Sequence, residues 1–116
     1  MSPIVPHTSF STLPLLPALL ETLDSLGFEK MTAIQEQSLP LILQGRDLIA
    51  QAKTGSGKTA AFGLGLLQTL NPSKLTPQAL VICPTRELAD QVTTELRRLA
   101  RQIPNVRMLT LCGGVP

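Results

Sequence analysis

The sequence predicts an α/β fold in which parallel strands form a doubly wound sheet between two layers of helices. The first observation is a glycine-containing loop, residues 52–59, that follows an apolar run and precedes a helix-prone run. The second is a run that is apolar throughout, residues 79–83, as is typical of a strand covered on both faces. The third is the alternation of strands and helices with short connections, which favours parallel strands joined by right-handed crossovers.

Length and composition indicate a globular chain. The 116 residues suffice for one small domain, and hydrophobic residues make up 43% of them, enough for a buried core. We expect residues 1–12 to form a flexible leader. Residues 13–116 should form part of a domain whose sheet is cut after about three strands. The net charge of +2 does not by itself indicate a nucleic-acid binder.

Two helices are predicted before the first strand. The first, residues 15–26, has leucines at helical spacing and Pro17 in its first turn, where the missing N–H costs nothing. The second, residues 32–43, begins with a threonine that is followed three residues later by Gln35, the pattern of a capping box. Pro40 is expected to kink or divide this second helix, because proline removes a backbone hydrogen bond.

Three strands and two helices are predicted in the rest of the chain. They are a strand at residues 48–52, a helix at 58–70, a strand at 79–83, a helix at 85–101 and a strand at 106–112. Gly63 and Gly65 lower the intrinsic propensity of the helix that contains them. We expect these two glycines to be close-packing positions against the sheet rather than to break the helix.

The loop at residues 52–59 has the residues that a phosphate-binding site needs. Gly55 and Gly57 let the backbone turn tightly, so that its N–H groups face an anion, and the following helix adds its positive N-terminal end. Lys58 can reach the β- and γ-phosphates of a nucleotide, and the Thr59 hydroxyl can bind Mg²⁺. The general P-loop pattern has glycine at its first position, where this chain has Ala52. The alternative is a glycine-rich surface turn that happens to contain lysine and threonine.

Gln35 and Phe28 could recognise the base of a bound nucleotide. A glutamine amide can pair with N6 and N7 of adenine together, and an aromatic ring can cover the face of the purine. The alternative assigns Gln35 to the capping box and Phe28 to the core. The two interpretations are compatible, because one cap can hold the amide that reads the base.

Two further loops follow predicted strands and are expected at the same edge of the sheet. Pro84, Thr85 and Arg86 follow the second strand, and free N–H groups at the start of the next helix could bind phosphate with them. Gly113 and Gly114 follow the third strand. Each loop also has an ordinary interpretation, because threonine is a good N-cap and a glycine pair is a common turn.

Arg97, Arg98 and Arg101 form a basic patch on the helix at 85–101. Because no aromatic residue is interleaved with them, a solvated helix face is favoured over a specific nucleic-acid contact. Cys83 and Cys112 have no metal-ligand spacing and are interpreted as reduced, buried core residues of a cytoplasmic protein. The sequence contains no signal-peptide pattern and no stretch near the ~20 apolar residues that span a bilayer.

Four motifs, in order along the chain, resemble those of the DEAD-box RNA helicases. Residues 27–35, with Phe10 upstream, resemble the Q motif of that family. Residues 52–59 match its motif I, which has alanine at the first position, and residues 84–89 match its motif Ia. The glycines at 113–114 resemble its GG motif. The surrounding sequence is most similar to the bacterial DbpA subgroup, which acts on large-subunit ribosomal RNA during ribosome assembly.

The resemblance implies a role for each matching residue. ATP would be bound by Phe28, Gln35, Ala52, Thr54, Gly55, Ser56, Gly57, Lys58 and Thr59. The RNA backbone would be contacted by Pro84, Thr85, Arg86, Gly113 and Gly114. Lys58 and Thr59 would act in catalysis, and Thr59 would hold Mg²⁺ together with the nucleotide. Met31 departs from the family, which usually has proline there.

The resemblance therefore implies a partial P-loop NTPase domain of the RecA-like type, belonging to an ATP-dependent RNA helicase. Hydrolysis needs a carboxylate that holds Mg²⁺, and no apolar strand of this sequence ends in aspartate. The Asp-Glu-Ala-Asp motif and the second RecA-like domain of the family are also absent. We expect residues 1–116 alone to have little or no ATPase or unwinding activity. The alternatives are a non-catalytic nucleotide- or RNA-binding fragment, a truncated gene product without activity, and a DNA-directed motor.

Overall fold

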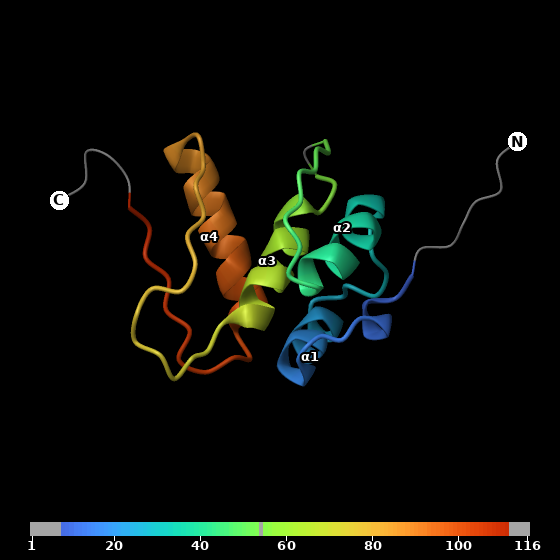
Figure 1. Cartoon of the computed structure of the whole chain (residues 1–116), viewed down its shortest axis with the longest axis horizontal. Helices are drawn as coiled ribbons and strands as arrows, with labels where there is room; N and C mark the ends of the chain where they lie inside the picture. Colours follow the sequence, from blue (N-terminus) through green and yellow to red (C-terminus); the bar gives the residue numbers. More distant parts are fainter. Residues whose placement is uncertain (1–7, 54, 112–116) are drawn as a thin grey trace, which may run out of the picture.

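Four α-helices and one short 3-10 helix make up the regular structure of residues 8–53 and 55–111, the part of the chain that the computed structural model describes. The elements are η1 (Phe10–Thr12), α1 (Pro17–Ser25), α2 (Ala33–Leu43), α3 (Lys58–Thr69) and α4 (Arg86–Ala100). Helix α3 lies between α2 and α4 and contacts both of them (Figure 1). The four predicted helices are thus confirmed. None of these described helices is long and apolar enough to cross a membrane.

Local capping groups begin the helices where the sequence predicts. The hydroxyl of Thr85 accepts a hydrogen bond from the Leu88 N–H at 3.1 Å, and Thr32 and Gln35 form their capping box. Pro17 occupies the first turn of α1. Replacement of a capping threonine by alanine typically costs about 0.5–2 kcal/mol, so these residues set the helix starts without help from distant contacts.

Helix α2 is not divided at Pro40, although the sequence suggested a kink or a break there. It runs continuously from Ala33 to Leu43 with the proline inside it. Pro40 itself is exposed, whereas Leu39 beside it is fully buried. Burial of the inner face against α3 therefore outweighs the lost backbone hydrogen bond.

The core consists mainly of leucines on the facing sides of the helices. Six leucine side chains are fully buried: Leu19, Leu23, Leu39, Leu64, Leu67 and Leu99. Burial of each contributes about 1.5–3 kcal/mol relative to an exposed position. The 3-10 helix η1 adds Phe10 to the same cluster, and the segment before α2 adds Met31; each is only 3% exposed. All four helices thus share one apolar interior.

Gly63 and Gly65 allow α3 to pack closely on both neighbouring helices. A Cβ atom on Gly65 would lie 2.1 Å from Cγ2 of Ile42 in α2. A Cβ atom on Gly63 would lie 2.8 Å from Cδ2 of Leu96 in α4. Both distances are shorter than non-bonded carbon atoms tolerate, so these glycines are close-packing positions as predicted, but they pack on helices and not on the predicted sheet.

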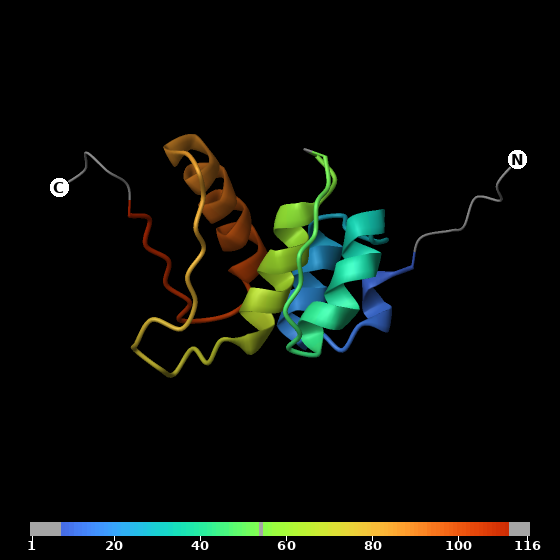
Figure 2. The same ribbon diagram turned by 45° about the horizontal axis from the view of Figure 1, so that its top comes forward.

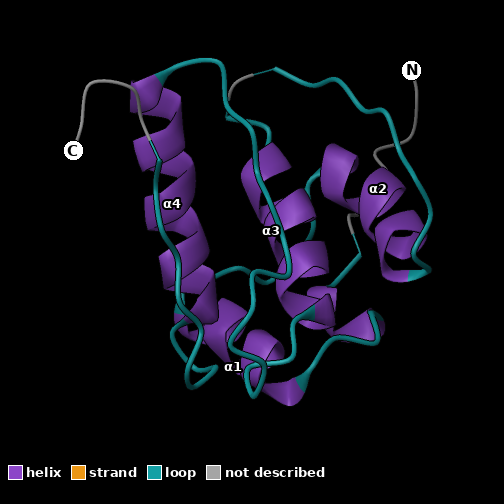
Figure 3. Cartoon of the chain, turned by 60° about the vertical axis from the view of Figure 1, so that its left-hand side comes forward, coloured by secondary structure: helices purple, strands orange, loops and turns teal. Residues whose placement is uncertain are grey.

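The described residues contain no β-strand, so the predicted three-stranded sheet is not seen. Residues 48–52, 79–83 and 106–111 run as elongated loops beside α3 and α4 (Figures 2 and 3). No backbone hydrogen bond joins these three segments within the described part of the chain. Ile49 and Ile82 are accordingly 97% and 84% exposed. A strand of a parallel sheet needs a hydrogen-bonded neighbouring strand about 4.8 Å away, and these segments do not have one among the described residues.

One of these segments still shows the alternation of a strand. Val106 and Met108 are half-buried against the core, whereas Leu109 and Leu111 are 83% and 84% exposed. One face of the segment is therefore packed and the other is open. Cys83, which we expected in the core, is only half-buried, and Cys112 lies outside the described residues.

Residues 8–12, part of the predicted flexible leader, pack on the core. Phe10 is buried, and its N–H donates a hydrogen bond to the carbonyl of Glu29 at 3.3 Å. The N–H of Met31 donates to the carbonyl of Thr8 at 2.8 Å. A proline at position 31 could not make that bond, so methionine gives this chain an additional link. The rest of the predicted leader lies outside the described residues.

Candidate nucleotide-binding site

The loop before α3 has the backbone conformation that the glycines predict. Gly55 and Gly57 have φ angles of +84° and +87°, in the left-handed region that favours glycine. Between them, the N–H of Ser56 donates to the carbonyl of Lys53 at 3.2 Å. Gly57 is the N-cap of α3, and because it has no side chain it makes no capping hydrogen bond to the first turn of the helix. The first turn of α3 therefore directs its backbone N–H groups toward the loop, as an anion site requires. Thr54 lies outside the described residues.

Helix α2 is joined to this loop by two side-chain hydrogen bonds. The hydroxyl of Thr32 donates to the carbonyl of Ser56 at 2.7 Å. The amide Nε2 of Gln35 donates to the carbonyl of Gly57 at 3.1 Å, while its Oε1 accepts from the Thr32 N–H at 2.8 Å. Gln35 is only 5% exposed. The capping box of α2 thus also positions the loop, an arrangement that the sequence analysis did not predict.

Gly57 is required at its position for a second, steric reason. A Cβ atom there would lie 2.4 Å from Nε2 of Gln35 and 3.1 Å from Oγ1 of Thr32. A side chain would therefore occupy the place of the Gln35 amide. The glycine combines a left-handed φ with a close approach of two segments.

A hollow of about 280 Å³ lies between the start of α2 and the loop. Ala52 and Ser56 line it from the loop side, and Ile34 and Gln37 line it from α2. The hydroxyl of Ser56 is buried and has no hydrogen-bond partner within the described residues. A buried hydroxyl without a partner is a group that a polar ligand could satisfy.

Two glutamines at this hollow were missed by the sequence analysis. Gln37 lies on α2 three residues after Ile34, and Gln51 precedes the loop; both line the hollow. The helical spacing of the α2 residues was a usable signal for Gln37. For Gln51 no signal existed, because its position at the hollow depends on how the segment before the loop packs against α2.

Lys58 and Thr59 form the first turn of α3, where the sequence analysis expected them. Lys58 is exposed and Thr59 is half-buried, so both are accessible to a ligand at the loop. No group of three or more His, Cys, Asp or Glu side chains that could hold a metal ion occurs among residues 8–53 and 55–111. A metal at this site would therefore depend on the threonine hydroxyl and on oxygens of the ligand itself.

Phe28 lies beside Phe10 rather than on the open face of the loop. Their ring centroids are 6.4 Å apart, with an angle of 41° between the rings. Phe28 is half-buried and packs against the core, as the ordinary interpretation of this residue predicts.

The second predicted site lies at the start of α4. Pro84, Thr85 and Arg86 are all exposed there, and the hydroxyl of Thr85 caps the helix. Figure 1 shows that the N-terminal ends of α3 and α4 lie at the same end of the molecule. The loop at Gly57 and the loop at Thr85 thus open in the same direction. The predicted third loop, residues 113–114, lies outside the described residues.

Comparison with known proteins matches the chain to one family. The family model of the DEAD/DEAH box helicases matches residues 32–116. The chain is 64% identical over 110 residues to the ATP-dependent RNA helicase DbpA of Escherichia coli K12, covering 94% of this chain and 24% of that protein. It is 49% identical to the DEAD-box ATP-dependent RNA helicase CshA of Bacillus cereus, over 92% of this chain and 20% of that protein.

Solved structures give the same result. A DEAD box protein from the hyperthermophile Methanococcus jannaschii superimposes with a TM-score of 0.88 at 37% identity, covering 97% of this chain and 31% of that one. Dbp5 of S. cerevisiae bound to RNA and ADP BeF3 superimposes with a TM-score of 0.77 at 42% identity, covering 81% of this chain and 25% of that one. The chain thus spans about a quarter of the length of the curated relative DbpA.

Proposed function

Because the chain belongs to the DEAD/DEAH box helicase family, we propose that it is part of the ATP-binding domain of an ATP-dependent RNA helicase. The observation that supports this best is the pair of hydrogen bonds from Thr32 and Gln35 to the loop carbonyls of Ser56 and Gly57. They hold the proposed base-recognition segment directly against the proposed phosphate loop. In the proposed full-length enzyme, ATP binding and RNA-stimulated hydrolysis drive local unwinding of RNA duplexes.

The proposed nucleotide site divides into a base end and a phosphate end. Gln35 would pair with adenine through the remaining hydrogen-bonding capacity of its amide, and Phe28 would cover the purine ring. Lys58 would bind the phosphates, and Thr59 would hold Mg²⁺, which neutralises phosphate charge when it is bound. The left-handed glycines and the buried Ser56 hydroxyl fit this use, because they offer N–H and O–H donors toward an anion.

The proposed RNA contacts lie at the ends of the predicted strands. Pro84, Thr85, Arg86, Gly113 and Gly114 would contact the RNA backbone. The likeness to Dbp5 bound to RNA and ADP BeF3 supports RNA as the ligand. We also propose that residues 48–52, 79–83 and 106–112 are strands of a doubly wound parallel sheet in the complete RecA-like domain, with a second such domain completing the enzyme.

The substrate and location are proposed from the relatives. The 64% identity to DbpA favours large-subunit ribosomal RNA and a role in ribosome assembly. A cytoplasmic location follows from the proposal, since ATP and ribosomal RNA are both present there in bacteria.

Nucleotide binding tests the phosphate end of the site. Residues 1–116 should bind a fluorescent ATP analogue weakly but saturably in the presence of Mg²⁺. Lys58→Ala should weaken binding about tenfold or more, because it removes a charge-assisted hydrogen bond. Lys74→Ala is the matched control, since Lys74 is an exposed lysine of another loop. Equal affinities of the two variants would contradict the assignment of Lys58.

Turnover tests the proposal that residues 1–116 do not hydrolyse ATP on their own. Phosphate release should stay at the level of the buffer with and without RNA, because the sequence has no carboxylate at the end of an apolar strand. Clear RNA-stimulated release by these residues would overturn this proposal. The alternative, a polypeptide without independent activity, is favoured by the exposed apolar segments and predicts neither turnover nor nucleotide binding.

A further inference from the structure

A group of arginines at the C-terminal end of α4 has no role in the proposed nucleotide site. Arg97, Arg98, Arg101 and Arg107 all fall within residues 96–111, a stretch that contains no acidic residue. These four are a large share of the ten basic residues of the chain. The sequence analysis favoured a solvated helix face for this patch. The structure shows that two of its members share a hollow.

Arg97 and Arg101 line a hollow of about 240 Å³. They are four residues apart on α4 and therefore lie on the same side of the helix. Ile103, Val106 and Met108, which follow the end of the helix, line the same hollow. The site thus combines two guanidinium groups with three apolar side chains.

Arg101 is held in place by a neighbouring helix. Its Nη2 donates a hydrogen bond to the hydroxyl of Ser25, at the end of α1, at 2.5 Å. A guanidinium group has five N–H donors, so this bond leaves donors free for a ligand. Because this bond already orients the Arg101 side chain, binding of an anion would cost little further side-chain entropy.

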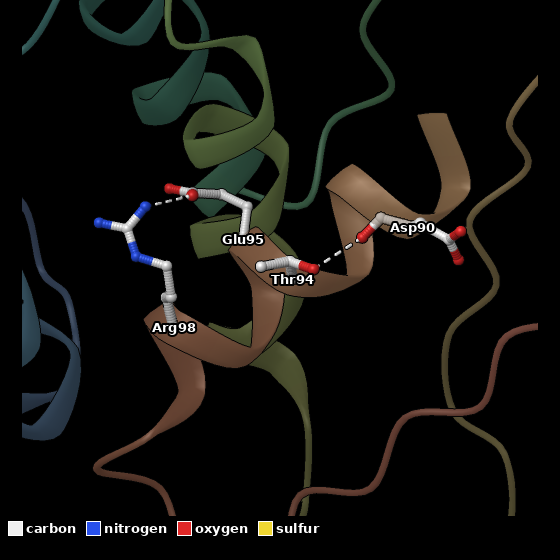
Figure 4. A network of polar contacts seen from close by, with 4 residues as sticks. All are labelled: Asp90, Thr94, Glu95 and Arg98. Atoms are coloured by element: carbon white, nitrogen blue, oxygen red, sulfur yellow. Dashed lines mark hydrogen bonds and ion pairs between the residues drawn. The ribbon is translucent and has the colours of Figure 1, made fainter. Parts of the chain in front are cut away.

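The acidic residue nearest in sequence does not neutralise this pair. Glu95 forms an ion pair with Arg98, whose Nη1 lies 2.8 Å from Oε2 of the glutamate (Figure 4). Arg97 and Arg101 have no ion pair within the described residues. Like charges four residues apart on a helix repel, so their shared hollow favours an anionic ligand.

The geometry points to a second RNA contact here: Arg97 and Arg101 bind a phosphate of the RNA strand, and the apolar side chains beside them contact its sugar. This inference rests on the proposed function, which brings RNA to the other end of α4. Planar guanidinium forks match phosphate oxygens bidentately, and the aliphatic side chains of the hollow can contact the sugar next to that phosphate. An acidic peptide is the competing ligand.

The position of the hollow predicts how much RNA the site needs. Helix α4 has 15 residues, so its ends are about 22 Å apart. Arg86 begins the helix at one end, and Arg101 follows it at the other. A short oligonucleotide at the Thr85 loop would not reach the hollow, whereas a longer one would.

Fluorescence anisotropy with labelled single-stranded RNA tests the proposal. RNA of about 5 and about 15 nucleotides, a range that brackets common single-strand site sizes, is titrated with residues 1–116 at several salt concentrations. The double variant Arg97→Gln/Arg101→Gln should bind the longer RNA more weakly. Its salt slope should fall by about 0.7, the change for one lost phosphate contact on a single strand, while binding of the shorter RNA stays unchanged.

Matched controls separate this proposal from the proposed function. Arg98→Gln removes one charge that is already paired and should leave the salt slope nearly unchanged. Arg101→Lys keeps the charge and should retain most of the affinity for the longer RNA, and circular dichroism checks that the double variant is folded. An unchanged slope in the double variant, or displacement of the RNA by polyglutamate at equal charge concentration, would overturn the second contact alone. Failure of the parent to bind either RNA would overturn both proposals.

Discussion

The side chain of Gln35 forms hydrogen bonds with two segments of the chain. Its Oε1 completes the cap of α2, and its Nε2 binds the carbonyl of Gly57. The side chain is buried, so loss of either bond would leave a buried polar group with neither a protein partner nor water to bond to. A residue that the sequence identifies as a cap therefore also determines the shape of the phosphate loop.

Replacement of Gly57 by alanine should damage both the loop and the fold. The φ of +87° disfavours any side chain, and the new Cβ would displace the Gln35 amide. We expect a loss of about 2–4 kcal/mol in the free energy of unfolding, from backbone strain together with a broken buried hydrogen bond. Thermal denaturation of residues 1–116 measures this loss, and binding of the ATP analogue should disappear.

Gly27→Ala is the control for that experiment. Gly27 has a similar φ of +82°, but nothing lies within 4 Å of its added Cβ. It should cost only the strain of the left-handed backbone, about 1–2 kcal/mol, and should leave nucleotide binding intact. An equal effect of both substitutions would show that contact with Gln35 contributes nothing.

Much of the candidate site could be predicted from local sequence, but its assembly could not. The pattern of glycine, lysine and threonine at residues 55–59 predicts the left-handed turns, because only glycine adopts them at low cost. The bond between Thr32 and Ser56 joins residues 24 positions apart. No local propensity encodes such a pair, so it became visible only in the structure.

At the scale of the elements, Pro40 is the residue of α2 whose replacement should raise stability. Alanine would restore an N–H donor to the helix interior and remove the clash of the proline ring. Since the position is exposed, no packing is lost, and Pro40→Ala should stabilise the chain by up to about 3 kcal/mol. The melting temperature is the measurement.

Pro17→Ala tests the same reasoning with the opposite expectation. Pro17 lies in the first turn of α1, where its N–H would have no partner in the helix and its fixed φ suits the start. Its replacement should change stability little or lower it slightly. A stabilisation as large as that from Pro40→Ala would contradict the positional explanation.

The helices were predictable and the sheet was not, for one physical reason. Threonine caps at positions 32 and 85 and the leucine spacing are local signals, and they placed every helix within about two residues. A strand such as residues 79–83 is defined by its partners. Its sequence is apolar throughout, yet Leu80 and Ile82 remain more than 80% exposed, because no ladder forms on either side within the described residues.

At the scale of the whole molecule, the exposed apolar segments should dominate behaviour in solution. Ile49, Ile82, Leu109 and Leu111 are each more than 80% exposed, which is unusual for so many aliphatic residues of a small protein. We expect residues 1–116 to bind the dye ANS and to self-associate at high concentration. Fluorescence and light scattering after size-exclusion chromatography measure the two effects.

The double variant Ile82→Lys/Leu109→Lys should reduce dye binding and keep the chain monomeric. The helical core should be unaffected, because neither side chain belongs to it. Thr76→Lys adds charge at an exposed position without removing apolar surface and should leave dye binding as it is. Weak dye binding by the parent would mean that these segments are covered in solution.

The bond between Gln35 and Gly57 also has a consequence for the order of folding. It closes a stretch of 22 residues, and loop closure over that length costs ~3 kcal/mol of chain entropy. Two hydrogen bonds of about 1 kcal/mol each do not offset that cost. The contact of Ile42 with Gly65 must form in the same step. The phosphate loop therefore reaches its shape only when α2 docks on α3, and a synthetic peptide of residues 52–59 should lack it.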